Sequence, residues 1–378
     1  MIEKLEYWWR HQIVYPILRL IFHNPRKDSP IDIRTIKRLL FLRYDRIGDM
    51  IVTTPIFRSL KQLNPALKIG VVASETNAEI IRYNPYVDSV YVIHSNWLKS
   101  IAEIIKAKKE NYEVVLNLIF NRTTSGGLLA NILSPLGIKI GQGDEKYRFY
   151  FNWLLKISRN NSHMIEIFVF IINKVFAIQL KPDQLSYEIF IDEKTKNTVS
   201  MYLTKYNLTP RDHFFAEKSF YIVFNLSAND SVRRISTEQA YSLGNHLGSM
   251  TSFRTVLLHS PNDHTMLEVK QNLVNNSNCL SFPERGSASL LEIASLIEGA
   301  LAVVTPDTSI IHFASATTTP VVGFYTKMQD VHEWLPHRVK NHIIISAENE
   351  PTSSILILDM IDAINDFIKE LNIEPLNK

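Results

Sequence analysis

The sequence predicts an α/β protein built from two halves, each a parallel sheet covered by helices. Short apolar runs alternate with segments of helical periodicity from Arg38 onward, and a second alternating series begins at Tyr221. Such alternation is typical of parallel strands joined by crossover helices. The length of 378 residues agrees with this prediction, because a domain commonly takes about 100 to 200 residues.

The first series is expected to begin with a strand, a polar loop and a helix. Leu39–Leu42 is a short apolar run, Tyr44–Asp49 is polar and holds Gly48, and Ile51–Leu63 has helical spacing. Ligands of such sheets bind at the carboxyl ends of the strands, so the polar loop is expected at the binding edge. Further strands are expected at Ile69–Ala73, Ser89–Ile93 and Val114–Leu118.

The alternation weakens between about residues 145 and 215, where the clearest element is an apolar helix near Ile165–Phe176. In the second series, Ser236 with Gln239 and Ser289 with Glu292 have capping-box spacing, which supports two helix starts. The expected strands are Tyr221–Asn225, Thr255–His259, Leu301–Thr305 and Val321–Phe324, and the expected helices are 237–248, 264–275, 289–298 and 355–371.

These patterns divide the chain into three segments. We expect a basic amphipathic segment at residues 1–30, a first α/β domain at 31–205 and a second α/β domain, which ends in a helix, at 206–378. Two such domains that face each other form a cleft, which is the natural place for a ligand.

Composition narrows the function. Hydrophobic residues make up 46% and charged residues 21%, which disfavours a disordered chain. The net charge of +3 is too small for the broad basic surface of a dedicated nucleic-acid binder. A single cysteine, Cys279, forms no intrachain disulfide, so a reducing cytosolic compartment is expected.

The N-terminal segment is both basic and apolar. Residues 1–40 hold eight basic and four acidic residues, and the apolar run among them is too short and too interrupted to span a bilayer. No small-residue cleavage site follows, which disfavours a secretory signal. One interpretation is an interfacial helix anchored by Trp8 and Trp9 and kinked at Pro16. The other is a helix packed on the body of the protein.

Several familiar motifs are absent. The chain has no phosphate loop, and its nearest approach to a dinucleotide fingerprint, Gly141-Gln142-Gly143, is followed by two acidic residues that would repel a pyrophosphate. The segment His332–His337 resembles a zinc-hydrolase motif, but its second histidine is one residue late and follows a proline. No Asp-x-Asp pair offers ligands for a metal-held diphosphate.

A first candidate loop follows the first expected strand. Gly48 permits close backbone approach, and Asp49 would place a carboxylate at the mouth of the cleft, where it could take a proton from a hydroxyl. The alternative is that Asp49 caps the helix that follows, a common role worth about 1 kcal/mol.

A second candidate loop lies between the first strand and the first helix of the second half. Arg233 and Arg234 stand close to an expected helix start, where guanidinium groups can clamp a phosphate. They could equally be solvated surface arginines.

A third candidate loop runs from Thr305 to His312, where a strand meets a helix whose free amides suit a diphosphate. Asp307 could alternatively be an ordinary helix cap. His312 could be a hydrogen-bonded histidine of the core.

Taken together, the motifs resemble the bacterial heptosyltransferases, glycosyltransferase family 9. The resemblance rests on Arg46-Ile47-Gly48-Asp49 followed by Pro55, and on Pro306-Asp307-Thr308-Ser309 followed by His312, Ala314, Ala316 and Pro320. It extends from about residue 38 to 330. It implies a GT-B fold, in which two Rossmann-like domains have parallel sheets that face each other across a cleft, with the acceptor side at 31–205 and the nucleotide-sugar side at 206–378. It also implies inverting transfer of a sugar from a nucleotide donor, commonly ADP-heptose, to the inner core of lipopolysaccharide.

The resemblance assigns roles to individual residues. Asp49 matches the catalytic base, with Gly48 and Arg46 in the acceptor-side loop, and Arg233 matches the basic residue on the donor diphosphate. The other expected donor-site positions are Ser227, Asn229, Asp307, Thr308, Ser309 and His312 at the diphosphate, and Asp263 and Ala288 at the nucleoside.

The chain also departs from the family pattern. Ser309 stands where the family usually has glycine, which adds a side chain where backbone should approach phosphate. Ile235 and Ser236 replace a Trp-Pro pair. A donor other than ADP-heptose therefore stays open.

The resemblance implies no metal or other cofactor, and it implies a nucleotide-sugar donor and a lipid-linked saccharide acceptor. Residues 1–25 would hold the protein on the inner face of the cytoplasmic membrane, and Asp49 would face Arg233 across the cleft. Two alternatives stay open: a nucleotide-sugar epimerase of the same architecture, and a nucleotide-sugar-binding protein without catalytic activity.

Overall fold

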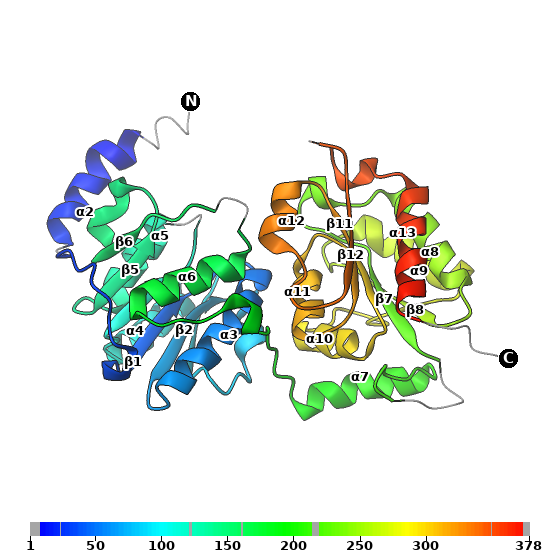
Figure 1. Ribbon diagram of the computed structural model, residues 1–378, viewed down its shortest axis with the longest axis horizontal. Coiled ribbons are helices and arrows are strands. Elements are labelled where there is room, and N and C mark those ends of the chain that lie inside the picture. Colours follow the sequence, from blue (N-terminus) through cyan, green and yellow to red (C-terminus); the bar gives the residue numbers. More distant parts are fainter. Residues whose placement is uncertain are drawn as a thin grey trace. The chain divides into compact units, whose positions relative to one another are not determined.

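The computed structural model describes residues 8–22, 24–120, 123–159, 162–213, 219–348 and 350–372. The chain divides into two compact units (Figure 1). Unit 1 takes Met1–Asn160 and Ile165–Gln184, and unit 2 takes Asn161–Met164 and Leu185–Lys378. Both units are α/β, as the sequence predicts.

Unit 1 is built on a six-stranded sheet in the order β3-β2-β1-β4-β5-β6, with every neighbouring pair parallel. The central strand is buried along nearly its whole length, because helices cover both of its faces. The strands are β1 (Arg38–Leu42), β2 (Lys68–Ser74), β3 (Ser89–Ile93), β4 (Val114–Asn117), β5 (Ile138–Gln142) and β6 (Trp153–Leu155).

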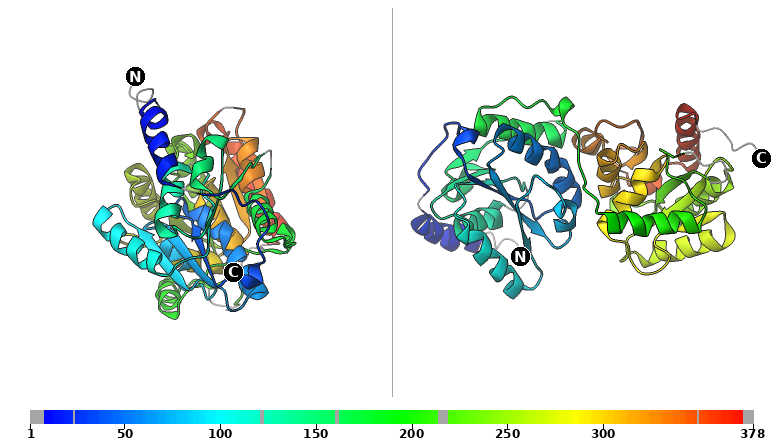
Figure 2. Two further views of the ribbon diagram at one scale, coloured as in Figure 1. Left: turned by 90° about the vertical axis from the view of Figure 1, so that its left-hand side faces the viewer. Right: turned by 90° about the horizontal axis from the view of Figure 1, so that it is seen from below.

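Helices flank this sheet on both sides, with α3 and α6 on one face and α4 and α5 on the other (Figure 2). The α-helices are α2 (Tyr15–Ile21), α3 (Ile47–Leu63), α4 (Trp97–Lys109), α5 (Thr123–Leu133) and α6 (Met164–Phe176). A π-helical turn, η1 (Arg10–Val14), leads into α2, and the short 3₁₀ helices are η2 (Ile33–Thr35), η3 (Ala78–Ile81), η4 (Glu145–Tyr150) and η5 (Pro182–Gln184).

One expected boundary in unit 1 is wrong in a way that matters for the site. The polar loop after β1 is shorter than predicted, because α3 begins at Ile47 rather than at Ile51. Arg46, with an extended backbone, is the N-cap residue. Gly48 and Asp49 therefore belong to the first turn of a helix.

Unit 2 repeats the architecture with the strand order β12-β11-β10-β7-β8-β9, again all parallel. Its strands are β7 (Tyr221–Asn225), β8 (Arg254–Leu258), β9 (Cys279–Ser281), β10 (Val303–Pro306), β11 (Val321–Tyr325) and β12 (Asn341–Ile345). Its helices are α7 (Glu193–Lys205), η6 (Ser231–Arg233), α8 (Thr237–Ser249), α9 (His264–Asn276), α10 (Leu290–Gly299), α11 (Ser309–Ala316), α12 (Met328–Trp334), η7 (Thr352–Ser354) and α13 (Ile357–Glu370).

Both predicted capping boxes are confirmed. Ser236 and Gln239 close the start of α8, and Ser289 and Glu292 close the start of α10, with side chain and backbone bonded in both directions. Each box satisfies two amide groups that a helix start would otherwise leave without a partner.

Unit 2 begins earlier than the boundary expected between residues 205 and 206. Helix α7 packs against α10 of unit 2, and Tyr202 donates a hydrogen bond to the carbonyl of Ser281 at 3.0 Å. These contacts join the segment from Leu185 onward to unit 2. No helix among the described residues is long and apolar enough to cross a membrane.

Candidate functional site

Each unit gathers polar side chains at the carboxyl edge of its sheet, where open α/β sheets bind ligands. In unit 1 the residues follow β1 and β4. In unit 2 they follow β7, β8, β10 and β11.

Arg43 is the centre of the group in unit 1. It directly follows β1, and its side chain is fully buried. Its guanidinium donates to the backbone carbonyl of Leu118 at 2.5 Å and to Asp49 Oδ1 at 2.6 Å, and a second ion pair joins it to Asp45 at 3.3 Å. The ring of Phe168 lies 4.5 Å from the guanidinium carbon. A buried charge is stable only with such partners, and a planar guanidinium can satisfy several at once.

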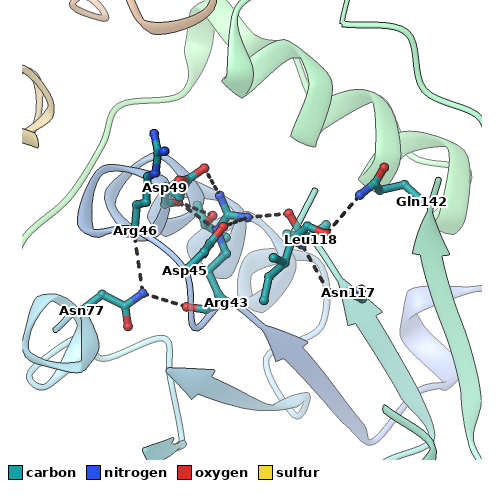
Figure 3. A network of polar contacts seen from close by, with 10 residues as sticks. Arg43, Asp45, Arg46, Asp49, Asn77, Asn117, Leu118 and Gln142 are labelled. Carbon is teal, nitrogen blue, oxygen red and sulfur yellow. Dashed lines mark hydrogen bonds and ion pairs between the residues drawn. The ribbon is translucent and has the colours of Figure 1, made fainter. Parts of the chain in front are cut away.

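The Arg43–Asp49 ion pair fixes the position of the predicted base (Figure 3). Asp49 is the third residue of α3, and its side chain does not cap the helix. Only Oδ1 accepts a hydrogen bond, whereas Oδ2 accepts none from any residue that the structure describes. The carboxylate is thus held by one oxygen and open at the other, as a general base requires.

The rest of the loop is anchored by backbone contacts. Asn77, which is buried, donates to the carbonyl of Arg43 at 2.9 Å and lies 3.5 Å from that of Arg46. The Arg46 side chain is exposed and forms no hydrogen bond or ion pair with the described part of the chain. Gly48 is buried in the first helical turn beside Asp49. Figure 3 shows Arg46 at the start of α3 and Asp49 in its first turn, close to Arg43.

In unit 2, the amide of Asn225 organises the ends of two central strands. Asn225 is the last residue of β7 and donates to the Ser227 carbonyl and to the Thr305 hydroxyl, both at 3.0 Å. Ser227 is buried, and its hydroxyl accepts from the backbone amide of Ser260 at 3.0 Å. The loops after β7, β8 and β10 are therefore tied to one another.

Arg233 and Asp307 form an ion pair at 2.9 Å, so two predicted donor-site residues from different loops are brought together. A second carboxylate, Asp330 of α12, lies 3.4 Å from the same guanidinium. The Arg233 side chain is 20% exposed, whereas that of Asp307 is almost completely buried. The buried carboxylate holds the arginine at the surface of the site. Asp307 is also not the N-cap residue of α11.

The cap of α11 is Thr308, whose hydroxyl accepts from the amide of Ile310 at 3.3 Å. Ser309 is the first residue of this eight-residue helix and is partly exposed. The free amides of the first turn point out of the helix start, where they can donate to an anion. The resemblance predicts the diphosphate at this position.

His312 lies in α11, one turn after Ser309, and is buried without a hydrogen bond from either ring nitrogen to the described residues. Burial, helped by nearby His163 and Arg233, lowers the pKa of His312 to about 3, so the ring is neutral at pH 7. Tyr187, whose ring centroid lies 6.4 Å away, also has a buried hydroxyl without a partner among these residues. Buried polar atoms without partners are rare and often mark a place for a ligand.

Of the other predicted residues, Asn229 and Asp263 form structural hydrogen bonds. Asn229 is exposed, and its carbonyl, like that of Ala228, accepts from Arg234 at 3.5 and 2.8 Å. Arg234 thus braces its own loop. Asp263 caps α9 through the amide of Met266 at 3.2 Å, and Ala288 is partly exposed in the loop before α10.

Close to Asp263 the structure has two basic groups that the sequence did not suggest, a half-buried histidine and a buried lysine. Burial and the charge of Lys270 lower the pKa of His259 to about 4. Burial lowers the pKa of Lys270 itself to about 8. His259 directly follows β8, beside the expected nucleoside position, and Lys270 lies in α9.

Sequence reasoning also missed Arg43, Asn225 and Asp330 as members of the site. Arg43 and Asn225 each stand at the end of a predicted strand, a signal that could have found them. Asp330 gave no such signal. Among the described residues, no group of three or more His, Cys, Asp or Glu side chains could hold a metal ion.

Comparisons with known proteins show the family and the fold. The family model described as glycosyltransferase family 9 (heptosyltransferase) matches residues 102–357, more than half of the chain. Its match begins after Asp49, so the first loop lies outside the matched range. Lipopolysaccharide heptosyltransferase 3 of Escherichia coli is 32% identical over 78 residues, which are 19% of this chain and 23% of that protein.

Two solved structures are similar over nearly the whole chain. A family 9 glycosyltransferase of Veillonella parvula has a TM-score of 0.75 at 18% identity, covering 90% of this chain and 99% of that one. The ADP-heptose lipopolysaccharide heptosyltransferase II of E. coli has a TM-score of 0.69 at 17% identity, covering 89% and 99%. The fold is therefore that of the GT-B heptosyltransferases. The chain belongs to glycosyltransferase family 9, the heptosyltransferases, and is a glycosyltransferase.

Proposed function

We propose that this glycosyltransferase moves a heptose from ADP-heptose to a lipopolysaccharide inner-core or other lipid-linked saccharide, with inversion and without a metal. The observation that carries the proposal is the state of Asp49, whose carboxylate is held at Oδ1 by a buried arginine and is open at Oδ2. The names of the similar proteins support the donor and the acceptor, since two of them are lipopolysaccharide heptosyltransferases.

The proposed reaction is a single displacement. Asp49 Oδ2 takes the proton from an acceptor hydroxyl as that oxygen forms a bond to the anomeric carbon of the donor. The bond from this carbon to the diphosphate oxygen breaks on the opposite face, and its electron pair leaves with the nucleoside diphosphate. Attack opposite the leaving group inverts the anomeric centre.

The leaving diphosphate gains negative charge, which the second group of residues would stabilise. Arg233 lies between two carboxylates, so its positive charge is already offset. Its proposed contribution is therefore directed hydrogen bonds from the remaining N–H groups, added to those of the amides at Thr308 and Ser309. His312 is neutral and can offer a ring nitrogen as donor or acceptor to the bound donor substrate.

The arrangement also supports a role for Arg43. An arginine fixed by a backbone carbonyl and two carboxylates cannot swing toward a substrate without leaving buried charges unpaired. Arg43 is therefore a positioning residue, which acts on the reaction through Asp49.

The function is tested with a panel of ADP-, UDP-, GDP- and dTDP-linked sugars. Thermal stabilisation identifies the donor, and release of nucleoside diphosphate is then measured with and without lipopolysaccharide precursors. We expect ADP-heptose to stabilise the protein most and its turnover to require the acceptor. Turnover without acceptor would indicate an epimerase, and binding without turnover an inert binder, and either result would contradict the proposal.

A lipid-linked acceptor places the enzyme on the inner face of the cytoplasmic membrane, and residues 1–25 are proposed to hold it there. Met1–Tyr7 and His23 lie outside the described residues.

A further inference from the structure

The helical segment from Trp8 to Ile21 presents an unusual face to solvent. A helix on the surface of a protein normally buries its apolar side. Here large apolar side chains are exposed instead, Leu20 by 89% and Ile21 by 63%. The exposed members are Trp8, Trp9, Ile13, Ile17, Leu20 and Ile21.

This exposure does not result from a loosely attached helix. Tyr15, on the other side of the segment, is only 3% exposed and packs on Tyr147, Phe149 and Tyr150 of η4, with ring centroids 5.7 to 6.5 Å apart. Its hydroxyl forms a hydrogen bond with Thr124 of α5 at 2.9 Å. The segment is packed on unit 1, as the interpretation of a helix packed on the protein expects. It also presents an exposed apolar face, as the interpretation of an interfacial helix expects.

The neighbouring helix α5 extends the apolar surface. Thr124 contacts Tyr15 of the N-terminal segment, and Asn131 contacts Asn24, which follows the segment. Leu128 lies between Thr124 and Asn131 on the same face of α5. Leu128 and Ile132 are both more than one third exposed. We call the six exposed residues of the N-terminal segment, together with Leu128 and Ile132, the docking face.

A basic pocket of about 380 Å³ lies beside the docking face. Three cations and one carboxylate line it, so its charge is positive. Arg19 lies 5.4 Å over the ring of Phe149, and its guanidinium forms no hydrogen bond or ion pair with the described residues. Lys146 is 3.5 Å from Asp144, and Arg148 donates to the carbonyl of Phe151. The lining residues are Arg19, Asn24, Glu145, Lys146, Arg148 and Phe149.

We propose that the docking face inserts into an anionic phospholipid bilayer and that the basic pocket takes the phosphate of a lipid headgroup. Tryptophans and aliphatic side chains beside basic groups are suited to the depth at which headgroups meet acyl chains. The positive pocket is complementary to the anionic inner leaflet. A second copy of the chain fits less well, because a two-fold contact would bring two basic pockets together.

The inference adds to the proposed function, on which it rests for the lipid nature of the acceptor. Apolar insertion and electrostatic attraction are each weak and reversible, and two such signals together give stable binding to a membrane. Unit 1, which carries Asp49, would then be held at the surface where a lipid-linked acceptor is found.

The experiment measures cosedimentation of the full-length protein with vesicles of phosphatidylcholine alone or of equal parts phosphatidylcholine and phosphatidylglycerol. We expect binding to the anionic vesicles only. The paired change Arg19→Gln and Lys146→Gln should weaken it by about fivefold per residue, since a cation at such a surface contributes about 1 kcal/mol. The paired change Ile17→Ser and Leu20→Ser should weaken it on the order of tenfold or more.

Matched controls change equivalent groups elsewhere. Lys181→Gln with Lys194→Gln removes two exposed cations, and Met201→Ser with Leu358→Ser removes two exposed apolar side chains. Binding to anionic vesicles should be unchanged in both. Unfolding midpoints of all variants should match the wild type, and a docking variant that loses binding only because it unfolds would overturn the assignment for that pair.

Equal binding to both vesicle types, or equal loss in docking and control variants, would overturn the proposal. A concentration-dependent dimer that Leu20→Ser dissociates would assign the face to a second copy instead. The Asp49→Asn variant separates this inference from the proposed function, because it should lose transfer and still bind vesicles.

Discussion

Both units hold an arginine between two carboxylates, and the comparison of these two groups shows how the same residue types serve different purposes. Arg43 is fully buried, and a backbone carbonyl and an aromatic ring complete its surroundings. Arg233 is 20% exposed, next to the start of α11 and a buried histidine without hydrogen bonds to the described residues.

The two groups differ in which polar atoms are left without a hydrogen-bond partner among the described residues. In unit 1 the arginine is satisfied and one carboxylate oxygen of Asp49 is open, which suits a group that accepts a proton. In unit 2 the carboxylates hold the arginine while N–H groups and a histidine ring stay available, which suits an anion. The four predictions that follow test this division.

The largest effect is expected from Asp49→Asn. The amide has the shape of the carboxylate but is not basic, so transfer should fall by about 10² to 10⁴. Binding of nucleoside diphosphate, measured by calorimetry, should stay unchanged. The exposed Asp183→Asn in unit 1 is the matched control and should transfer normally. Near-normal turnover by Asp49→Asn would show that the open oxygen of Asp49 is not the base.

Arg43→Ala should destabilise unit 1 strongly. Removal of one partner of a buried ion pair commonly costs about 3 to 5 kcal/mol, because the other charge is left without compensation. Urea unfolding should show this loss. The surface variant Arg34→Ala, whose partner Asp32 is exposed, should lose far less stability than Arg43→Ala, because solvent screens an exposed ion pair. Similar losses in the two variants would contradict the distinction between them.

Arg233→Ala should weaken nucleoside diphosphate binding by roughly 10- to 100-fold, since a hydrogen bond to a charged group contributes about 1.5 to 3 kcal/mol. Asp307 would also lose its partner and repel the phosphates. Arg234→Ala, which removes a brace of the same loop, is the matched control and should have a smaller effect. Unchanged affinity in calorimetry would remove Arg233 from the phosphate site.

His312 should make stability depend on pH. Its pKa is lowered from 6.5 to about 3, so between these values the unfolded chain binds more protons than the folded one. Stability therefore rises with pH through this window and is fully present above pH 6.5. The wild-type protein should lose free energy of unfolding between pH 7 and pH 5. The His312→Asn variant should lose up to about 2 kcal/mol less over the same range, because it lacks this histidine. Urea titrations at both pH values check this, and identical losses would contradict it.

Much of the fold could be predicted because apolar runs and helical periodicity are patterns within short stretches of sequence. Strands β3 and β7 have the predicted bounds, since each is an apolar run between polar segments. Strands β5, β6, β9 and β12 were missed. β6 and β9 have only three residues each, and β12 is half-buried at an edge of its sheet, so neither length nor alternation marks them.

The site was predictable where its residues stand in motifs and not where they meet through folding. Asp49 and Arg233 are found in recognisable loops. The partner of Arg233 in α12, Asp330, is 97 residues away in sequence, and only the parallel placement of β7, β10 and β11 brings them together. The start of α3 was also missed, because polar residues of the first turn read as a loop.

The most direct test of the account is a double-mutant cycle on single-turnover transfer. Arg43→Lys keeps the charge but loses the planar fork that orients Asp49, so it should slow transfer in the wild-type background. If Arg43 acts through Asp49, the same change should have no further effect in the Asp49→Asn background. Equal slowing in both backgrounds would contradict the claim that Asp49, held by Arg43, is the base.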